Sequence, residues 1–280
     1  MLAYRHAFHA GNHADVLKHI VLVLVLRHLA AKEKGFRFVD THGGAGGYSL
    51  QGRYARKHDE HARGIGALWT RDDLPAAVAD YVELVRTFNP DGKLAQYPGS
   101  PSLALMLLRP QDELRAFELH PTEEKILRAT LAGQHRASAV FGDGFTGLRS
   151  QLPPPTRRGA VLVDPSYEGT ADYPKVVATM RDAVARFADG VYLVWVPQVS
   201  KVQAAELPRR LAALAPKGWL HVRLSVQEPD ARGFGLAGSS VFVLNPPHTL
   251  HATLAATLPY LVDVLGQHAG ANFMIDRVDA

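Results

Sequence analysis

The stretch Phe36–Ser49, FRFVDTHGGAGGYS, joins a short apolar segment directly to a glycine-rich turn. Residues 36–40 are typical of a buried strand, and a glycine-rich turn at the end of a strand is typical of the ligand-binding edge of an open α/β sheet. No Gly-Lys-Ser/Thr follows, which excludes a Walker phosphate loop, and the strict Gly-x-Gly-x-x-Gly spacing of dinucleotide folds is missing. The turn therefore indicates either a ligand site of another kind or simple loop flexibility.

The flanking sequence alternates helix and strand patterns. Before the stretch, Asn12 and Asp15 resemble a capping box, apolar residues at helical spacing continue to Arg27, and Gly35 is a natural stop. After it, Ser100-Pro101 has the N-cap and first-turn signature of a helix to about Arg109. Further strands are expected at 114–119, 139–141, 160–163, 191–196, 219–227 and 239–245, with helices from about 121 and at about 173–187 and 200–214. This order predicts a doubly wound α/β sheet that closes on an antiparallel hairpin with one reversed strand.

Composition excludes several classes of protein. The 280 residues are 47% apolar and 21% charged, which favours one large folded domain over disorder. The absence of cysteine excludes disulfides, thiolate metal sites and a cysteine nucleophile. The beginning MLAYRHAFHAGNH has no secretory signal, and the longest apolar run, Ile20 to Leu26, is too short to span a bilayer, so we expect a cytoplasmic protein with no membrane partner. The net charge of +4 is compatible with a polyanionic partner without requiring one.

Four expected strand ends carry acidic residues: Asp40, Glu118, Asp143 and Asp164. Each alone could be a helix cap. Together they have the pattern of an adenosine site, in which the glycine turn lets the backbone approach, Glu118 accepts both ribose hydroxyls and Asp143 takes the adenine amine. Because phosphate-binding features are lacking, this pattern suits S-adenosylmethionine better than NAD or ATP.

The tetrad Asp164-Pro165-Ser166-Tyr167 resembles the [Asn/Asp/Ser]-Pro-Pro-[Tyr/Phe] motif of amino-group methyltransferases. The Asp164 side chain and the Pro165 carbonyl could hold both hydrogens of an aryl amine and turn its lone pair towards the methyl group, while Tyr167 stacks on the base. Ser166 departs from the usual second proline and should loosen the loop. The alternative is a plain turn, which Asp-Pro often opens.

Histidines and basic residues gather before and after the glycine turn. His6, His9 and His13 could be taken for a zinc site, but nothing completes a four-coordinate set, so we expect polar packing or RNA contact and no metal. The basic run from Arg53 to Arg63 could contact phosphate or form a solvated face.

Several motifs together closely resemble the RlmJ family of bacterial 23S rRNA adenine-N6 methyltransferases, which act at adenine-2030. They are MLAYRHAFHAGNHADVLKH at the start, FVDTHGGAGGY, YPGSP, ELHP, the Asp-Gly pair at 143–144 and RRGAVLVDPSYE. The resemblance implies a Rossmann-like class I methyltransferase fold, with a mostly parallel seven-stranded sheet whose last strand is antiparallel. It places the methyltransferase domain at 1–46 and 98–280 and a helical insertion at 47–97.

The same resemblance implies roles for individual residues and partners. Tyr4 would contact the RNA and Asp164 would serve at the amine, while S-adenosylmethionine would be contacted by His19, His42, Ser100, Glu118, Asp143, Gly144 and Asp164. It also implies a monomer with no obligatory protein partner, acting on 23S rRNA that is either free or in an assembly intermediate.

Three functions follow from these patterns. The leading hypothesis is an RNA adenine-N6 methyltransferase whose target base is unpaired or flipped, because the amine is unreachable inside a helix. The tetrad alone fits a DNA adenine-N6 methyltransferase equally well. Ser166 leaves open a third hypothesis, an RNA-binding module that binds S-adenosylmethionine but has lost catalysis.

Overall fold

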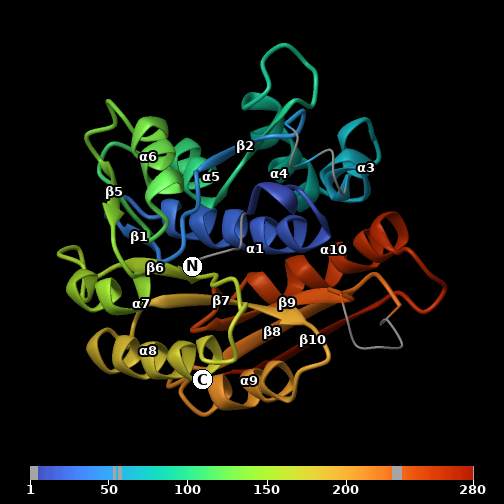
Figure 1. Cartoon of the computed structure of the whole chain (residues 1–280). Coiled ribbons are helices and arrows are strands. Elements are labelled where there is room, and N and C mark those ends of the chain that lie inside the picture. The colour runs from blue at the N-terminus through green and yellow to red at the C-terminus, as the bar shows by residue number, and fades with distance from the viewer. Residues whose placement is uncertain (1–5, 53–54, 56–58, 229–234, 280) are drawn as a thin grey trace.

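An eight-stranded sheet forms the centre of the computed structural model, which describes residues 6–279 except 53–54, 56–58 and 229–234 (Figure 1). The strand order is β10-β8-β9-β7-β6-β1-β4-β5. The strands are β1 (Arg37–Asp40), β4 (Glu113–Glu118), β5 (Ala137–Phe141), β6 (Gly159–Val163), β7 (Val191–Gln198), β8 (Trp219–Ser225), β9 (Gly238–Leu244) and β10 (Asn272–Val278).

Five neighbouring strands run parallel, in the order β7-β6-β1-β4-β5. Their register places Asp40 at the end of β1 beside Ala116 of β4 and Leu162 of β6, so the carboxyl ends of these strands meet at one edge. The chain leaves β1 and β6 in opposite directions across the sheet, which makes this point the topological switch where open α/β sheets bind ligands. The expected α/β class and mostly parallel sheet are confirmed.

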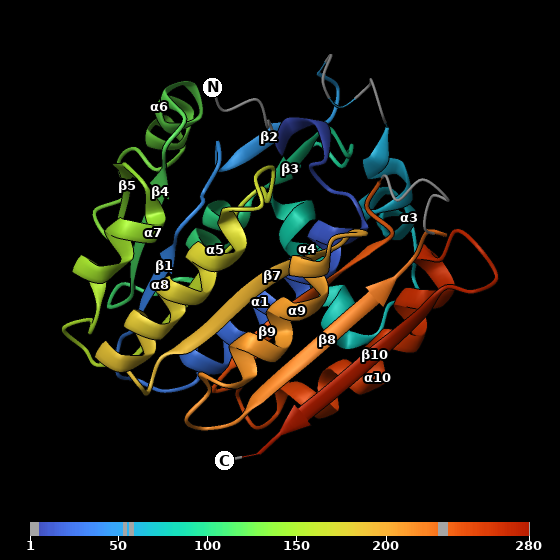
Figure 2. The same cartoon turned by 60° about the horizontal axis from the view of Figure 1, so that its bottom comes forward.

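The sheet has eight strands rather than seven, and two of them are reversed rather than one. β9 is antiparallel to β7 and β8, and β10 is antiparallel to β8 at the edge of the sheet (Figure 2). The hairpin of β8 and β9 was expected, but α10 (Leu250–Leu265) and β10 were not. β10 has mostly exposed side chains and pairs on one side only, so its sequence lacks the apolar alternation of a half-buried strand.

Helices cover both faces of the sheet. One face carries α1 (His13–Ala30), α5 (Ser100–Leu107), α6 (Pro121–Thr130) and α10, and the other carries α7 (Gly144–Gly147), α8 (Asp172–Arg186) and α9 (Val202–Ala212) (Figures 1 and 2). Each face has its own apolar cluster, so the fold has three layers. No helix in the described part of the chain is both long and apolar enough to cross a bilayer.

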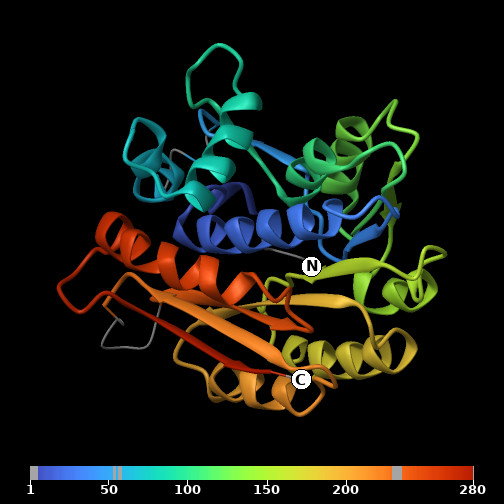
Figure 3. The ribbon, with the colours of Figure 1, turned by 180° about the vertical axis from the view of Figure 1, so that it is seen from behind.

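Helix α1 is buried on nearly all sides. It packs against the sheet on one side and against α4 (Ala76–Thr87), α5 and α10 on the others; seen from behind, α1 and α10 lie side by side (Figure 3). A helix in such a position is expected to be apolar all round. Its first turns nevertheless bury Asp15, Lys18 and His19, and these polar residues must find partners inside the protein.

Two predicted caps differ from the structure in detail. The Asn12 side chain caps α1 by accepting hydrogen bonds from the backbone N–H groups of Ala14 and Asp15, but the Asp15 carboxylate accepts from Gly11 N–H instead of completing the capping box. Gly99, not Ser100, is the N-cap of α5. The Ser100 hydroxyl instead serves as a hydrogen-bond donor to the buried carboxyl of Asp40.

The described residues of the segment 47–97 form a small layer that packs on α1. The strands β2 (Gly47–Ser49) and β3 (Gln96–Pro98) pair antiparallel and bring the two ends of the segment together. Between them lie a 3-10 helix (Glu60–Arg63), α3 (Ile65–Trp69) and α4. The division into a methyltransferase domain and a separate insertion stays a prediction.

Candidate active site

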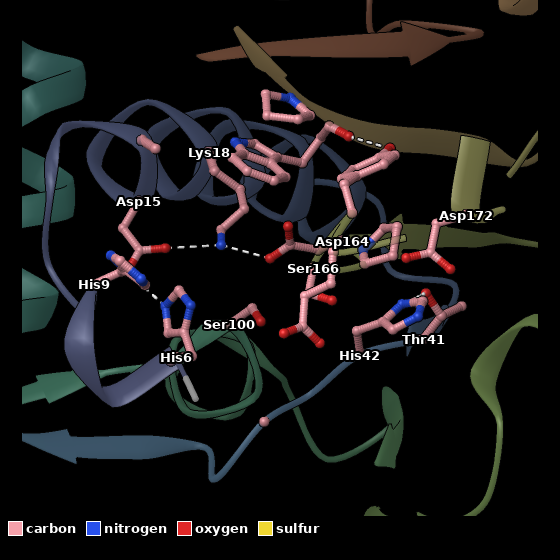
Figure 4. Close-up of a pocket in the computed structure, with 18 of the residues that line it drawn as sticks. His6, His9, Asp15, Lys18, Thr41, His42, Ser100, Asp164, Ser166 and Asp172 are labelled. Atoms are coloured by element: carbon pink, nitrogen blue, oxygen red, sulfur yellow. Dashed lines mark hydrogen bonds and ion pairs between the residues drawn. The ribbon is translucent and has the colours of Figure 1, made fainter. Parts of the chain in front are cut away.

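A cavity of about 650 Å³ opens at the carboxyl ends of the parallel strands and is closed on one side by the start of α1 (Figure 4). This volume is within the usual range for small-molecule sites. Asp40 lies beneath the cavity, and the predicted Tyr4 lies outside the described residues. All other predicted site residues line it: His19, His42, Ser100, Glu118, Asp143, Gly144, Asp164, Pro165 and Tyr167.

The glycine turn after β1 orients the carboxylate of Glu118. Gly44 has a φ of +58°, and a Cβ there would lie 2.0 Å from the Tyr48 hydroxyl, so the turn requires glycine. Gly44 N–H donates to Glu118 Oε2 at 2.9 Å, and His120 N–H donates to Oε1 at 2.6 Å. Burial raises the pKa of Glu118, although these two hydrogen bonds lower it. The carboxylate is thus held at the cavity wall with lone pairs left for hydroxyl donors.

The turn after β5 lies close against the end of β1. Asp143 accepts a hydrogen bond from Phe145 N–H at 2.8 Å and begins the short helix α7. A Cβ on Gly144 would lie 1.8 Å from the Thr41 carbonyl oxygen, so only glycine allows this approach. The His42 ring lies edge-on to Phe145 at 4.8 Å, and burial lowers the pKa of His42 to about 4, which keeps it neutral.

Beneath the cavity, Asp40 joins the glycine turn to helix α5. The Ser100 hydroxyl donates to Asp40 Oδ2 at 2.6 Å, and His42 N–H donates to Oδ1 at 3.1 Å. Burial raises the pKa of Asp40 to about 6 in spite of these bonds. Asp40 therefore holds together the elements that form the cavity floor.

A chain of charged side chains leads from the start of the protein to the tetrad. His6 Nε2 lies 2.9 Å from Asp15 Oδ2, Lys18 Nζ lies 2.8 Å from Asp15 Oδ1, and the same Nζ donates to Asp164 Oδ2 at 2.5 Å (Figure 4). Burial opposes the charge of Lys18, but the two carboxylates outweigh it and raise the lysine pKa above its usual value. Lys18 therefore carries a permanent positive charge against Asp164.

Lys18 is not among the site residues predicted from the sequence. Its partner Asp164 is 146 residues away, so no local motif connects the two. The available indication was compositional, because Asp15 and Lys18 interrupt a helix whose other residues are largely apolar. A lysine on such a helix is almost never fully buried unless it is paired, and the pairing marks it as a candidate site residue.

Hydrogen bonds also fix the loop that carries the tetrad. Tyr167 has a φ of +52°, its hydroxyl donates to the Trp195 carbonyl at 2.7 Å, and its own carbonyl accepts from Lys201 Nζ at 3.2 Å. Its ring packs against Tyr173 with centroids 4.7 Å apart. Ser166 lines the cavity in the place where a second proline is usual, within a loop that these bonds already constrain.

The amino-terminal histidines have polar partners in the fold. His9 Nδ1 lies 3.0 Å from both carboxylate oxygens of Glu60, and the Asn12 amide also donates to Glu60. Burial lowers the pKa of His13 to about 4. In the described part of the chain, no group of three or more His, Asp and Glu residues is arranged to hold a metal ion.

The basic run at 53–63 is only partly described. Residues 53–54 and 56–58, which include Arg53, lie outside the described residues. Arg63 lines the cavity and donates to the Gln267 side chain at 3.0 Å. Contact of this run with phosphate stays a prediction.

Several known proteins are similar to this chain over most of its length. The family model described as "Ribosomal RNA large subunit methyltransferase D, RlmJ" matches residues 33–276. The chain is 43% identical over 261 residues to ribosomal RNA large subunit methyltransferase J of Escherichia coli strain K12, covering 93% of each chain. It is also 43% identical over 279 residues to the protein of that name from Haemophilus influenzae, covering 99% of each. A crystal structure of a Legionella pneumophila protein superposes with a TM-score of 0.89 at 32% identity, covering 96% of this chain and 98% of that one.

Proposed function

This chain belongs to the RlmJ family of large-subunit ribosomal RNA methyltransferases, and on that premise we propose that it methylates the exocyclic N6 amine of an adenine in 23S rRNA. By the family resemblance the target is adenine-2030, and the methyl donor is S-adenosylmethionine. The observation that carries the proposal is the position of Asp164 and Pro165. They lie at the end of β6, beside the glycine turn of β1 and against Lys18, inside the cavity.

The residues around the cavity fit S-adenosylmethionine. Glu118 and Asp143 lie at the ends of adjacent strands, as the ribose and adenine of one adenosine require. Lys18 is neutralised by two carboxylates, so the space beside Asp164 favours a cation such as a sulfonium over a phosphate. When bound, the cofactor supplies a methyl group made electrophilic by the positively charged sulfur.

Asp164 and Pro165 orient the amine. Lys18 engages Oδ2 of Asp164, and Oδ1 has no other partner among the described residues, so Oδ1 is available to accept one amine hydrogen. The Pro165 carbonyl accepts the other, which turns the nitrogen lone pair towards the methyl group. Such positioning removes much of the entropic barrier to transfer. The negative charge of Asp164 also stabilises the positive charge that develops on the nitrogen, and it can receive the proton that nitrogen loses.

Lys18 and Asp15 support this geometry. Lys18 is held between the two carboxylates, and Asp15 is fixed in turn by His6 and by Gly11 N–H. A carboxylate that pairs with a buried ammonium has few alternative rotamers, so Oδ1 of Asp164 stays directed at the amine. We assign Lys18 and Asp15 as positioning residues.

The substrate must present its base outside a helix. An adenine amine in a duplex is engaged in base pairing, and the tetrad lies within a cavity, so the target base is unpaired or flipped. Tyr4 as an RNA contact and Tyr167 as a stacking platform remain parts of the proposal. We further propose a monomer without an obligatory protein partner, as the family resemblance implies, and a cytoplasmic location.

The test is methylation of defined polymers. Purified protein and S-adenosylmethionine are incubated with unmodified 23S RNA, or with adenine-containing DNA of matched length, and the digested nucleosides are resolved by mass spectrometry. N6-methyladenosine in the RNA, mapped to one position, is the expected product. Preferential methylation of the DNA would support the DNA enzyme instead. Cofactor binding without product on either polymer would support the inactive binding module.

A further inference from the structure

Three buried aromatic side chains connect the cavity to residues 47–97. His19 Nδ1 lies 2.7 Å from the Tyr97 hydroxyl, which lies 2.8 Å from the Tyr81 hydroxyl. His19 belongs to α1, Tyr97 to β3 and Tyr81 to α4, and none is more than 1% exposed. The His19 and Tyr97 rings stack with centroids 5.6 Å apart. These contacts leave little freedom for the three hydrogen-bonding groups.

The imidazole of His19 is neutral. Burial lowers its pKa to about 3, so only one of its two nitrogens carries a hydrogen at neutral pH. Nδ1 is engaged by Tyr97, whereas Nε2 has no hydrogen-bond partner among the described residues. His19 lines the cavity. Its Nε2 is not among the unpartnered side-chain atoms that are fully enclosed by protein, so this nitrogen is accessible to a ligand.

The number of hydrogens on these three side chains determines which group donates in each of the two hydrogen bonds. Among the described residues, the Tyr81 hydroxyl has Tyr97 as its only partner. If Nδ1 of His19 donated to Tyr97, one of the two tyrosine hydrogens would be buried without an acceptor, which is costly. If Tyr81 donates to Tyr97 and Tyr97 donates to Nδ1, every hydrogen is bonded. Nδ1 is then the acceptor and the hydrogen is on Nε2.

We infer that Tyr81 and Tyr97 fix His19 as the Nε2–H tautomer, so that His19 donates a hydrogen bond to the carboxylate of the methionine portion of S-adenosylmethionine. The inference rests on the proposed function, because it assigns the cofactor to this cavity. Glu118 and Asp143, at the ends of β4 and β5, are matched to the ribose and adenine, whereas His19 lies on α1, which packs over β6, β7 and β9 on the other side of β1. The carboxylate is the acceptor left for that side. Tyr97 is thus a positioning residue through which residues 47–97 act on cofactor affinity.

Calorimetry of cofactor binding tests the inference. Tyr97→Phe removes the donor to Nδ1, and we expect the Kd for S-adenosylmethionine to rise roughly tenfold, as for one lost hydrogen bond. Methyl transfer at saturating cofactor should change less than about twofold, because His19 does not touch the amine in the proposed geometry. Tyr81→Phe should raise the Kd much less, because Tyr97 can still donate to His19. Tyr192→Phe is the matched control, since its buried hydroxyl bonds to the carbonyls of Ala183 and Phe187 outside the cavity.

Nitrogen-15 NMR of the histidine rings reads the tautomer directly, with the His19 signals assigned by their loss in His19→Asn. In the cofactor-free protein we expect a hydrogen on Nε2 and none on Nδ1, and a mixture of tautomers in Tyr97→Phe. A hydrogen on Nδ1 in the unaltered protein would overturn the inference. So would an unchanged Kd in a Tyr97→Phe variant that melts as a folded protein.

Two results separate this inference from the proposed reaction. If cofactor binding and the tautomer are as expected but no RNA is methylated, only the reaction is wrong. If the protein does not bind S-adenosylmethionine, the assignment of His19 to the cofactor is overturned together with the proposed function.

Discussion

Replacing Lys18 by methionine removes the ammonium that lies between the buried carboxylate of Asp15 and the partly buried carboxylate of Asp164. The lysine side chain is 5% exposed, and its Nζ lies 2.8 Å from Asp15 and 2.5 Å from Asp164. Methionine retains most of the side-chain volume, so the packing of α1 is largely preserved. The change therefore isolates the charge.

The expected loss of stability is large. Removing one partner of a buried ion pair typically costs about 3–5 kcal/mol, because the remaining charge is left uncompensated. Two carboxylates lose their partner here, although Asp15 keeps His6 and Gly11 N–H. Activity should fall as well, by about 10²-fold, because Asp164 is no longer held in one orientation.

The loss of stability should depend on pH. Burial opposes ionisation of Asp15, but His6 and Lys18 hold its pKa well below the usual value, so in the unaltered protein it stays ionised from pH 7 to 5. Without Lys18 its pKa rises, and protonation relieves the repulsion as the pH falls. Compared with the unaltered protein, the variant should therefore be less unstable at pH 5 than at pH 7.

Urea unfolding at pH 5 and 7 and methyl transfer at saturating cofactor measure these effects. Lys125→Met is the control, because Lys125 is exposed on α6, and we expect it to change stability by no more than about 0.5 kcal/mol. A Lys18→Met protein within about 1 kcal/mol of the original at pH 7, with full activity, would refute the role given to this chain of charges.

Three further changes test the elements around the site. Asp40→Asn should remove a pH-dependent cost of stability: because the pKa of Asp40 is raised to about 6, urea unfolding should show the variant gaining up to about 3 kcal/mol relative to the unaltered protein as the pH rises from 3 to 8, mostly between pH 4 and 6. Asn12→Ala should cost about 1 kcal/mol in the same assay through the lost cap of α1, and an unchanged midpoint would contradict the cap. Gly144→Ala places a Cβ 1.8 Å from the Thr41 carbonyl oxygen and should weaken cofactor binding more than tenfold by calorimetry, whereas Gly169→Ala, with its nearest atom 3.9 Å away, should not.

The strand-end carboxylates could be predicted because topology brings them together. In a parallel sheet every strand delivers its last residue to the same edge, so a correct strand assignment already gathers Glu118, Asp143 and Asp164. The strand at 36–40 and its glycine turn fixed the position of that edge. No knowledge of side-chain contacts was needed for this part of the site.

Long-range pairing could not be predicted in the same way. The contact of Lys18 with Asp164 and the hydrogen bond of Ser100 to Asp40 depend on how α1 and α5 pack on the sheet, and local patterns do not encode this. Ser100 looks like an N-cap in sequence because serine is common there, but the buried Asp40 carboxyl competes for its hydroxyl.

The carboxyl-terminal elements were missed for local reasons. Helix α10 contains Pro259, a residue that normally interrupts helices, and it is maintained here by packing against α1 and the sheet. The edge strand β10 includes the charged pair Asp276 and Arg277 and buries no side chain fully. Tertiary contacts outweigh local propensity in both elements.

The most direct test of the proposed reaction is the single-turnover rate of methyl transfer to 23S RNA by Asp164→Asn at saturating S-adenosylmethionine. Asparagine preserves the shape of the side chain but removes the negative charge that faces the amine and pairs with Lys18. Asp182→Asn, at an exposed position on α8, is the matched control. We expect a fall of at least about 10²-fold for Asp164→Asn and an unchanged rate for the control. A rate for Asp164→Asn close to that of the unaltered protein would refute the role given to Asp164.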